Sequence, residues 1–245
     1  MKLVRLHAWT KDLKEAAKIQ ENLAHFVDLN LPPKEIELIA GADVAYSKKD
    51  NAIFASIVVM NYPELTPLEK VKAQSYTDFP YVPGFLTFRE GPVLVKALER
   101  VQRVPDLILF DGNGIAHPKG IGLATHLGVI LDLPTVGCAK KKLLGTHHEV
   151  PDQFGAQVPL EHEDKQIGAV VRTRVGVKPL YISAGNKIGL DDAVELVLSA
   201  TRGYRLPEPQ RLAHVLVNKM RRNYDNRKKD NRGNHKNRNK QRQIR

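Results

Sequence analysis

The sequence predicts an α/β fold in which one mixed sheet is flanked by helices. Three extended runs, at residues 35–47, 52–62 and 69–79, are rich in β-branched residues or alternate apolar with polar residues. Helical spacing then alternates with short apolar strands in the order β-β-β-α-β-α-β. Since no repeat and no linker interrupts residues 1–220, the sequence predicts one domain there.

The first elements follow from caps, breakers and period. A polar helix is predicted over about residues 11–26, with Thr10 as its cap, and it must end before Pro32 and Pro33. The three extended runs come next. The polar loop 48–51 suits a hairpin between the first two of them.

The remaining elements alternate along the chain. A helix is predicted from the spacing of Val93, Val95, Leu98 and Val101, with Pro92 as its first residue. After it we expect a strand at 107–112, a helix at 120–131, a strand at 134–140, a hairpin within 168–183, and helices at 191–201 and 208–220.

The positive charge gathers at one end of the chain. The formal net charge is +11, and residues 221–245 carry eleven Lys or Arg against two Asp, a net of +9 that leaves +2 for the rest. Because residues 221–245 have almost no apolar side chains, we expect a disordered basic tail. It is predicted to attract phosphate, and a tail that only aids solubility is the alternative.

The composition excludes several classes of protein. No apolar run approaches the roughly 20 residues needed to cross a membrane, and the N-terminus lacks the apolar stretch of a signal peptide. Cys138 is the single cysteine, so no disulfide framework forms and a structural zinc site is disfavoured. These features predict a cytosolic location, and we expect a monomer.

Two acidic residues follow or lie within apolar strands. Asp43 lies in the run LIAGADVAY, and Asp111 ends LILFD. Buried carboxylates on neighbouring strands repel each other unless a cation lies between them, and a hard ion such as Mg²⁺ fits that need. For Asp43 the metal interpretation is favoured, whereas Asp111 is equally well explained as a turn residue of Asp-Gly-Asn-Gly.

Two further motifs each have two interpretations. Thr87 and Glu90 match a capping box, but Pro92 suits a helix that starts later and leaves Glu90 free at its mouth. The glycine-rich run 111–128 is neither a dinucleotide fingerprint nor a Walker loop. It is either a flexible surface loop or a place where the backbone closely approaches a flat ligand.

Four blocks together carry a family resemblance. The blocks are GADVAY (41–46), PYVPGFLTFRE (80–90), DGNGIAHPKGIGLATHLG (111–128) and GCAKKKLLG (137–145). In this order they resemble the motifs of endonuclease V, the deoxyinosine 3′ endonuclease, over most of residues 20–220. The resemblance implies a ribonuclease H-like mixed sheet flanked by helices, with an added hairpin and C-terminal helices, in residues 1–220. The basic tail, residues 221–245, has no counterpart in these motifs.

The resemblance also implies roles for individual residues. Asp43 and Asp111 would bind Mg²⁺, with Mn²⁺ as a substitute, and Glu90 would be a further catalytic carboxylate. Lys140 matches the family's active-site lysine, which stabilises the leaving oxygen or the pentavalent intermediate. His214 matches a histidine brought in by the C-terminal helix, with a core histidine as the alternative. His117 matches too, but its task stays open.

Recognition would lie in the loop that precedes Glu90. The resemblance implies a wedge that enters the duplex, Pro80-Tyr81-Val82-Pro83, whose two prolines keep the loop rigid. A backbone-lined pocket for hypoxanthine would be made by Gly84, Leu86, Gly112, Gly122, Leu123, Ala139 and Leu143.

The implied reaction is metal-assisted hydrolysis of inosine-containing DNA. The second phosphodiester 3′ of the lesion would be cut, leaving a 3′-OH and a 5′-phosphate. An endoribonuclease acting on inosine in RNA is the alternative. A protein that binds altered bases without cutting is disfavoured because Asp43, Glu90 and Asp111 are all present.

Overall fold

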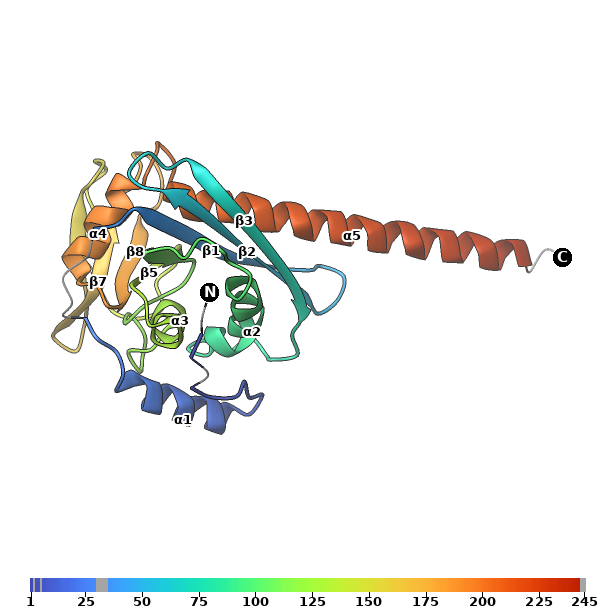
Figure 1. Cartoon of the computed structure of the whole chain (residues 1–245), viewed down its shortest axis with the longest axis horizontal. Coiled ribbons are helices and arrows are strands. Elements are labelled where there is room, and N and C mark those ends of the chain that lie inside the picture. Colours follow the sequence, from blue (N-terminus) through green and yellow to red (C-terminus); the bar gives the residue numbers. More distant parts are fainter. Residues whose placement is uncertain (2, 5, 30–34, 243–245) are drawn as a thin grey trace.

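One eight-stranded sheet forms the centre of the molecule (Figure 1). The computed structural model describes residues 1, 3–4, 6–29 and 35–242, and residues 230–242 as backbone only. The strands lie in the order β3-β2-β1-β4-β5-β8-β7-β6. Their bounds are β1 Leu38–Tyr46, β2 Ala52–Asn61, β3 Pro67–Tyr76, β4 Leu107–Phe110, β5 Thr135–Ala139, β6 Gln157–His162, β7 Lys165–Val171 and β8 Leu180–Asn186.

The sheet is mixed, as predicted. Strand β1 pairs antiparallel with β2 and parallel with β4, and β4 pairs parallel with β5. Strands β8, β7 and β6 extend the sheet in antiparallel fashion, and the predicted hairpin is the β7–β8 pair. The sequence did not predict β6, whose burial alternates only weakly along its length.

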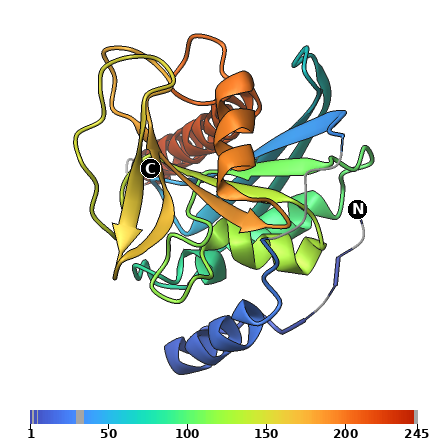
Figure 2. The same ribbon diagram turned by 90° about the vertical axis from the view of Figure 1, so that its left-hand side faces the viewer.

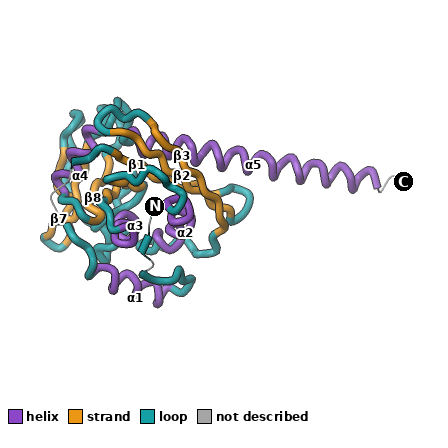
Figure 3. The backbone as a smooth tube through the Cα atoms, viewed as in Figure 1, coloured by secondary structure: helices purple, strands orange, loops and turns teal. Residues whose placement is uncertain are grey.

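Helices cover both faces of the sheet (Figures 2 and 3). The helices are α1 Leu13–Ala24, α2 Leu86–Leu98, α3 Leu123–Leu131, α4 Leu190–Ser199 and α5 Glu208–Arg242. One core lies between the sheet and α2 with α3, and a second lies between the opposite face and α4 with the start of α5. Successive β1 residues feed different cores, since Ile39 belongs to the second and Ala40 to the first.

Helix α1 lies outside these layers, below the body in Figure 1. Its cap is Asp12 rather than the predicted Thr10: the Asp12 carboxylate accepts a 2.8 Å hydrogen bond from the backbone N–H of Glu15. Pro32 and Pro33, which were expected to stop the chain after this helix, lie outside the described residues.

Helix α2 begins earlier than predicted. Its N-cap is Phe85, and Pro92 lies inside the helix rather than at its first position. The prediction failed because the proline removes only one internal hydrogen bond, and tertiary packing offsets that loss. Gly91 shows how tight this packing is, because a Cβ at that position would lie 2.4 Å from the Trp9 ring. The capping box is also absent, since Thr87 is not the N-cap.

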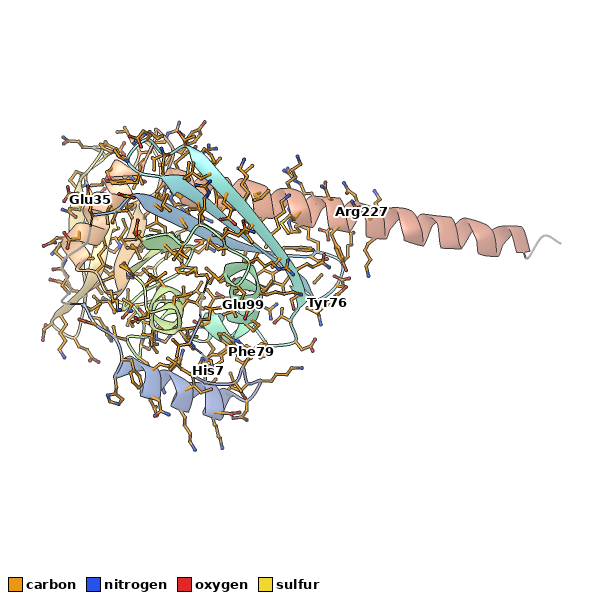
Figure 4. All side chains as sticks on the ribbon, in the orientation of Figure 1. His7, Glu35, Tyr76, Phe79, Glu99 and Arg227 are labelled. Atoms are coloured by element: carbon orange, nitrogen blue, oxygen red, sulfur yellow. The ribbon has the colours of Figure 1, made fainter. Side chains whose placement is uncertain are left out.

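Helix α5 differs most from its prediction. It was expected to end near residue 220, with a disordered tail beyond, but it is helical to Arg242 and projects from the body (Figure 1). Its continuation is held by the β1–β2 turn: Asp225 accepts a 2.8 Å hydrogen bond from Ser47, and Tyr224 donates one of 2.8 Å to Asp50. Arg227 lies where the helix leaves the body (Figure 4). No helix in the described part of the chain is both long and apolar enough to cross a membrane.

Candidate active site

The two predicted metal ligands lie side by side on neighbouring strands, Asp43 within β1 and Asp111 directly after β4. Ala42 of β1 is in register with Phe110 of β4, so the next residue on each strand, Asp43 or Asp111, lies opposite the other. The Asp111 backbone N–H donates to the Ala42 carbonyl at 3.4 Å. The turn interpretation of Asp111 therefore does not exclude the metal interpretation, because the residue follows a strand and still faces Asp43.

The short distance between Asp43 and Asp111 also affects the pKa of Asp111. Burial and the charge of Asp43 raise the pKa of Asp111, Lys140 lowers it, and the net result is a pKa of about 6. Asp43 is only 4% exposed. Two buried carboxylates this close together form a site that a cation would stabilise.

Glu90 is the third acidic residue of this region. It is 8% exposed, and the Tyr46 hydroxyl donates a 2.7 Å hydrogen bond to its Oε1. Burial raises the pKa of Glu90 to about 8, and the charges of Asp111 and Asp43 act in the same direction. We call Asp43, Glu90 and Asp111 the carboxylate centre. Tyr46 was not singled out in the sequence, where it is one more aromatic residue of a strand.

Lys140 follows β5 and forms an ion pair with Asp111. Its backbone is fixed by Arg205, whose guanidinium donates 2.8 Å hydrogen bonds to the carbonyls of Lys140 and Pro179. The sequence identified the lysine but not the arginine that holds its backbone, because the two are far apart in the chain.

His214 reaches the carboxylate centre from α5. Its Nδ1 lies 2.6 Å from Asp43 Oδ2, and its side chain is 44% exposed, which excludes the core histidine alternative. Asn218, one turn later, donates a 3.0 Å hydrogen bond to the His214 carbonyl. The first turn of α5 approaches β1 at Gly41, where a Cβ would lie 2.1 Å from the Pro209 carbonyl carbon. Glycine at 41 therefore permits the contact that brings His214 to Asp43.

The donor set suits a hard ion that completes its shell elsewhere. Within the described residues, no group of three or more His, Cys, Asp and Glu side chains is placed to hold a metal ion. Asp43 and Asp111 offer carboxylate oxygens only, and Mg²⁺ typically binds one or two carboxylates together with water and substrate phosphate. The carboxylate oxygens fit an ion of this kind better than a structural zinc, whose closed sites are built from cysteine and histidine.

The wedge loop, residues 80–83, presents an exposed ring. The Tyr81 side chain is 72% exposed, although both ends of the loop are fixed. Before the loop, buried Phe79 stacks on Phe88 with ring centroids 5.8 Å apart, and Arg89 donates a hydrogen bond to the Phe79 carbonyl. Phe79 lies between the α2 region and α1 (Figure 4). The loop is therefore firmly anchored where it leaves β3.

The other end of the loop is fixed at Gly84. This residue has φ +85°, a conformation that favours glycine, and its carbonyl accepts two hydrogen bonds of 2.7 Å. One comes from Gln20 of α1 and the other from His117 of the glycine-rich run. Gln20 is 1% exposed. No pattern in the sequence points to its role, because a polar residue in a polar helix is ordinary.

The contacts of His117 define its protonation state. The Lys119 backbone N–H donates to its Nδ1 at 3.1 Å, so Nε2 carries the proton that it donates to Gly84. Burial lowers the pKa of His117, which favours the neutral ring. In this structure His117 is a brace between the wedge loop and the glycine-rich run.

A pocket of about 190 Å³ lies beside the wedge loop. Of the predicted pocket residues, it is lined by Gly84, Leu86, Gly122, Leu123 and Leu143. Gly112 and Ala139, which are both buried, are not among its lining residues. The lining also includes the wedge residues Tyr81, Val82 and Pro83, and five side chains that the prediction missed or left without a role: Thr87, Asn113, His117, Lys141 and Lys142.

The glycine-rich run is neither a flexible loop nor, for the most part, a ligand surface. A Cβ at Gly114 would lie 2.0 Å from the Ala184 carbonyl oxygen, and one at Gly122 would lie 2.4 Å from that of Asn113. A Cβ at Gly137 of β5 would lie 2.3 Å from the Gly114 backbone nitrogen. These glycines allow the protein's own backbone to pack closely, and only Gly122 also faces the pocket.

Comparison with known proteins agrees with this geometry. The family model described as Endonuclease V matches residues 21–215. The chain belongs to the endonuclease V family. An Endonuclease V of a Nostoc species is 46% identical over 220 residues, which are 89% of this chain and 99% of the relative.

Solved structures of the family have the same fold. The crystal structure of a Bacillus subtilis endonuclease V is 33% identical, with a TM-score of 0.88, and the match covers 93% of this chain and all of that one. This confirms the predicted ribonuclease H-like fold. A Ciona intestinalis endonuclease V variant, solved with a 23mer DNA containing an inosine followed by a ribo-adenosine, is 26% identical with a TM-score of 0.76, over 86% of this chain and 98% of that one.

Proposed function

We propose that this endonuclease recognises deoxyinosine in DNA and hydrolyses the second phosphodiester bond on its 3′ side, leaving a 3′-OH and a 5′-phosphate. One observation carries the proposal. A single short segment joins the two halves of the site, because Lys140 contacts Asp111 and Leu143, three positions later, lines the pocket. A base in the pocket and a phosphate at the carboxylate centre therefore lie on either side of this segment.

Asp43 and Asp111 are the proposed ligands of a Mg²⁺ ion, for which Mn²⁺ would substitute. When bound, such an ion supplies an activated water and stabilises charge on the phosphoryl oxygens. The raised pKa of Asp111 supports this assignment, since a cation favours the ionised carboxylate that burial and Asp43 disfavour.

The other polar residues have distinct proposed roles. His214 fixes the orientation of the Asp43 carboxylate through its Nδ1–H. Glu90 is held at Oε1 by Tyr46, which leaves its second oxygen to take a proton from the attacking water. Lys140 is the proposed donor to the leaving oxygen, and Asp111 holds its ammonium group at the centre until substrate binds.

Recognition is proposed to combine insertion with fit. Stacking of Tyr81 on a neighbouring base returns about 1–3 kcal/mol, and the anchored loop loses little entropy on insertion. A weakened inosine pair is cheaper to open than a normal one. The pocket then selects hypoxanthine, because a close-fitting lining rejects the extra amino groups of adenine and guanine.

Cleavage of inosine in RNA is the second candidate. It is favoured by the Ciona complex, in which a ribonucleotide follows the inosine. Paired substrates that differ only in the sugar of the nucleotides after inosine separate the two functions by rate.

We further propose a monomeric, cytosolic enzyme. The wedge loop, the pocket and the carboxylate centre all come from one chain, so the site is complete without a second copy. The basic residues 221–245 are proposed to add attraction to phosphate that weakens with salt. Light scattering tests the monomer.

The deciding experiment is a nicking assay on a labelled duplex with one inosine, in Mg²⁺ and in EDTA. A single product that ends one nucleotide beyond the inosine, formed only with Mg²⁺, supports the proposal. No cut, or the same cut in a duplex with adenosine at that position, would contradict it. An RNA version of the labelled strand, run in parallel, tests the second candidate.

A further inference from the structure

A second cavity, of about 440 Å³, lies on the far side of the segment that follows β5. Lys140, Lys141 and Lys142 form one wall, and Lys178, Pro179 and Tyr181, from the β7–β8 connection and β8, form another. The rest of the lining is His147, Glu149, Val150 and Arg172. We call this cavity the basic groove.

The lysines of the basic groove are available for a ligand. Lys141, Lys142 and Lys178 are exposed, and their ammonium groups make no hydrogen bond or ion pair with any residue that the structure describes. Arg172 differs, because it donates to the Val150 carbonyl at 2.9 Å and pairs with Asp152 at 3.3 Å. Arg172 therefore shapes the groove, whereas the lysines give it a positive surface that one acidic residue, Glu149, only partly offsets.

The groove is continuous with the carboxylate centre but separate from the base pocket. Lys140 lines the groove and also pairs with Asp111. Lys141 and Lys142 line both cavities, so their segment forms the partition between them. When a strand has a base in the pocket and the phosphate on its 3′ side at the carboxylate centre, the part of the strand that passes Lys140 is the part that continues beyond that phosphate.

We infer that the basic groove binds the phosphates of the cleaved strand on the 3′ side of the scissile bond. This inference rests on the proposed function, because the cut 3′ of the base sets the direction of the strand. Lysine ammonium groups bind phosphate as point charges without reading sequence, so the groove holds any nucleotide. The Tyr181 and His147 rings, 5.6 Å apart, offer an edge for a base beyond the phosphate.

The test combines one lysine with the length of the strand. Lys178→Ala alters only the groove, since Lys178 does not line the base pocket. The matched control is Lys70→Ala, an exposed lysine of β3 at the opposite edge of the sheet. Substrates carry one inosine and extend 2, 4, 8 or 12 nucleotides beyond it on the 3′ side, and a second set is shortened on the 5′ side instead.

For substrates with long 3′ extensions, Lys178→Ala is expected to raise KM severalfold with kcat nearly unchanged. It should also make binding less dependent on salt, because the plot of log K against log salt becomes less steep by about 0.7 to 0.9. The difference in KM between Lys178→Ala and wild type should vanish for the substrate with the shortest 3′ extension. It should persist in all substrates that are shortened on the 5′ side. Loss of the difference on 5′ shortening, or an equal effect of Lys70→Ala, would overturn the inference. Wild-type nicking of the longest substrate tests the proposed function separately.

Discussion

The carboxylate centre and the wedge loop lie in one site but are built in opposite ways. Asp43 and Glu90 are buried, and each is bonded by a side chain from another element, His214 or Tyr46. Tyr81, in contrast, points its ring into solvent from a loop anchored only at its two ends. Burial thus raises the pKa values of Glu90 and Asp111 in the carboxylate centre. The wedge loop, in contrast, is held at both ends while its ring stays exposed.

The contrast agrees with the proposed role of each region. A site for a cation and a phosphate gains from low dielectric, because fixed charges interact more strongly there than in water. A ring that stacks on a base must be exposed before binding, so its loop can be made rigid only from behind. Substitutions in the centre should therefore change the chemical step, and substitutions in the loop should change access to a paired base.

The largest effect is expected from Asp43→Asn. Losing one of two ligand carboxylates removes several kcal/mol of charge stabilisation, so nicking should fall by about a thousandfold or more. Binding to inosine DNA should be largely retained, as measured by gel shift in EDTA and Mg²⁺. Asp164→Asn, in the exposed β6–β7 turn, is the matched control. Full nicking by Asp43→Asn in Mg²⁺ would remove the metal assignment.

The centre and the loop also differ in how far the sequence predicts them. Asp43 and Asp111 were found because a carboxylate in or after an apolar strand is costly, and strand register then places them together. The resemblance supplied His214, but its contact with Asp43 depends on Gly41 admitting α5, which no local pattern shows. Supports such as Tyr46, Arg205 and Gln20 act across long chain separations and leave no periodic trace.

Secondary structure was predicted where local preference and packing agree. Strands β1 and β2 and the turn between them were found from alternation and a polar loop. Helix α2 was started too late because packing overrides the preference of Pro92. Helix α5 was ended too early because its composition was weighed without its anchors on the β1–β2 turn, Tyr224 and Asp225.

Tyr81→Ala should give the next largest effect. Loss of about 1–3 kcal/mol of stacking corresponds to roughly a tenfold loss of affinity or more for a duplex. A single-stranded inosine substrate needs no insertion and should lose much less, whereas Tyr81→Phe should keep most activity on both. Rates on paired and unpaired substrates provide the measurement. Equal losses on the two by Tyr81→Ala would mean that the ring does not act as a wedge.

Gln20→Ala tests the anchoring of the loop from behind. One of the two hydrogen bonds to the Gly84 carbonyl is lost while that of His117 remains. A net hydrogen bond of about 0.5–1.5 kcal/mol predicts a loss of roughly threefold to tenfold on duplex substrate. Glu21→Ala, which breaks only the surface pair with Lys119, is the control. An equal loss on single strands would indicate a general effect on folding rather than on the loop.

The smallest effect is the contribution of the carboxylate centre to the change of stability with pH. The folded-state pKa of Glu90 is raised to about 8 and that of Asp111 to about 6, so the unfolded chain loses these protons first. The contribution of these two carboxyls to stability without metal should therefore fall as pH rises from about 4.5 to 8. His117 and His126, whose pKa values are lowered by burial, contribute in the opposite direction. Mg²⁺ favours the ionised carboxylates, so its stabilising effect should be greater at pH 8 than at pH 5.5. Calorimetry in EDTA and in Mg²⁺ measures the change of stability with pH and the stabilising effect of the ion.

Two variants serve as comparisons in this measurement. Tyr81→Ala should follow wild type, whereas Glu90→Gln should reduce the fall of stability with rising pH. A stabilising effect of Mg²⁺ that does not change with pH would mean that the cation does not bind at these carboxylates.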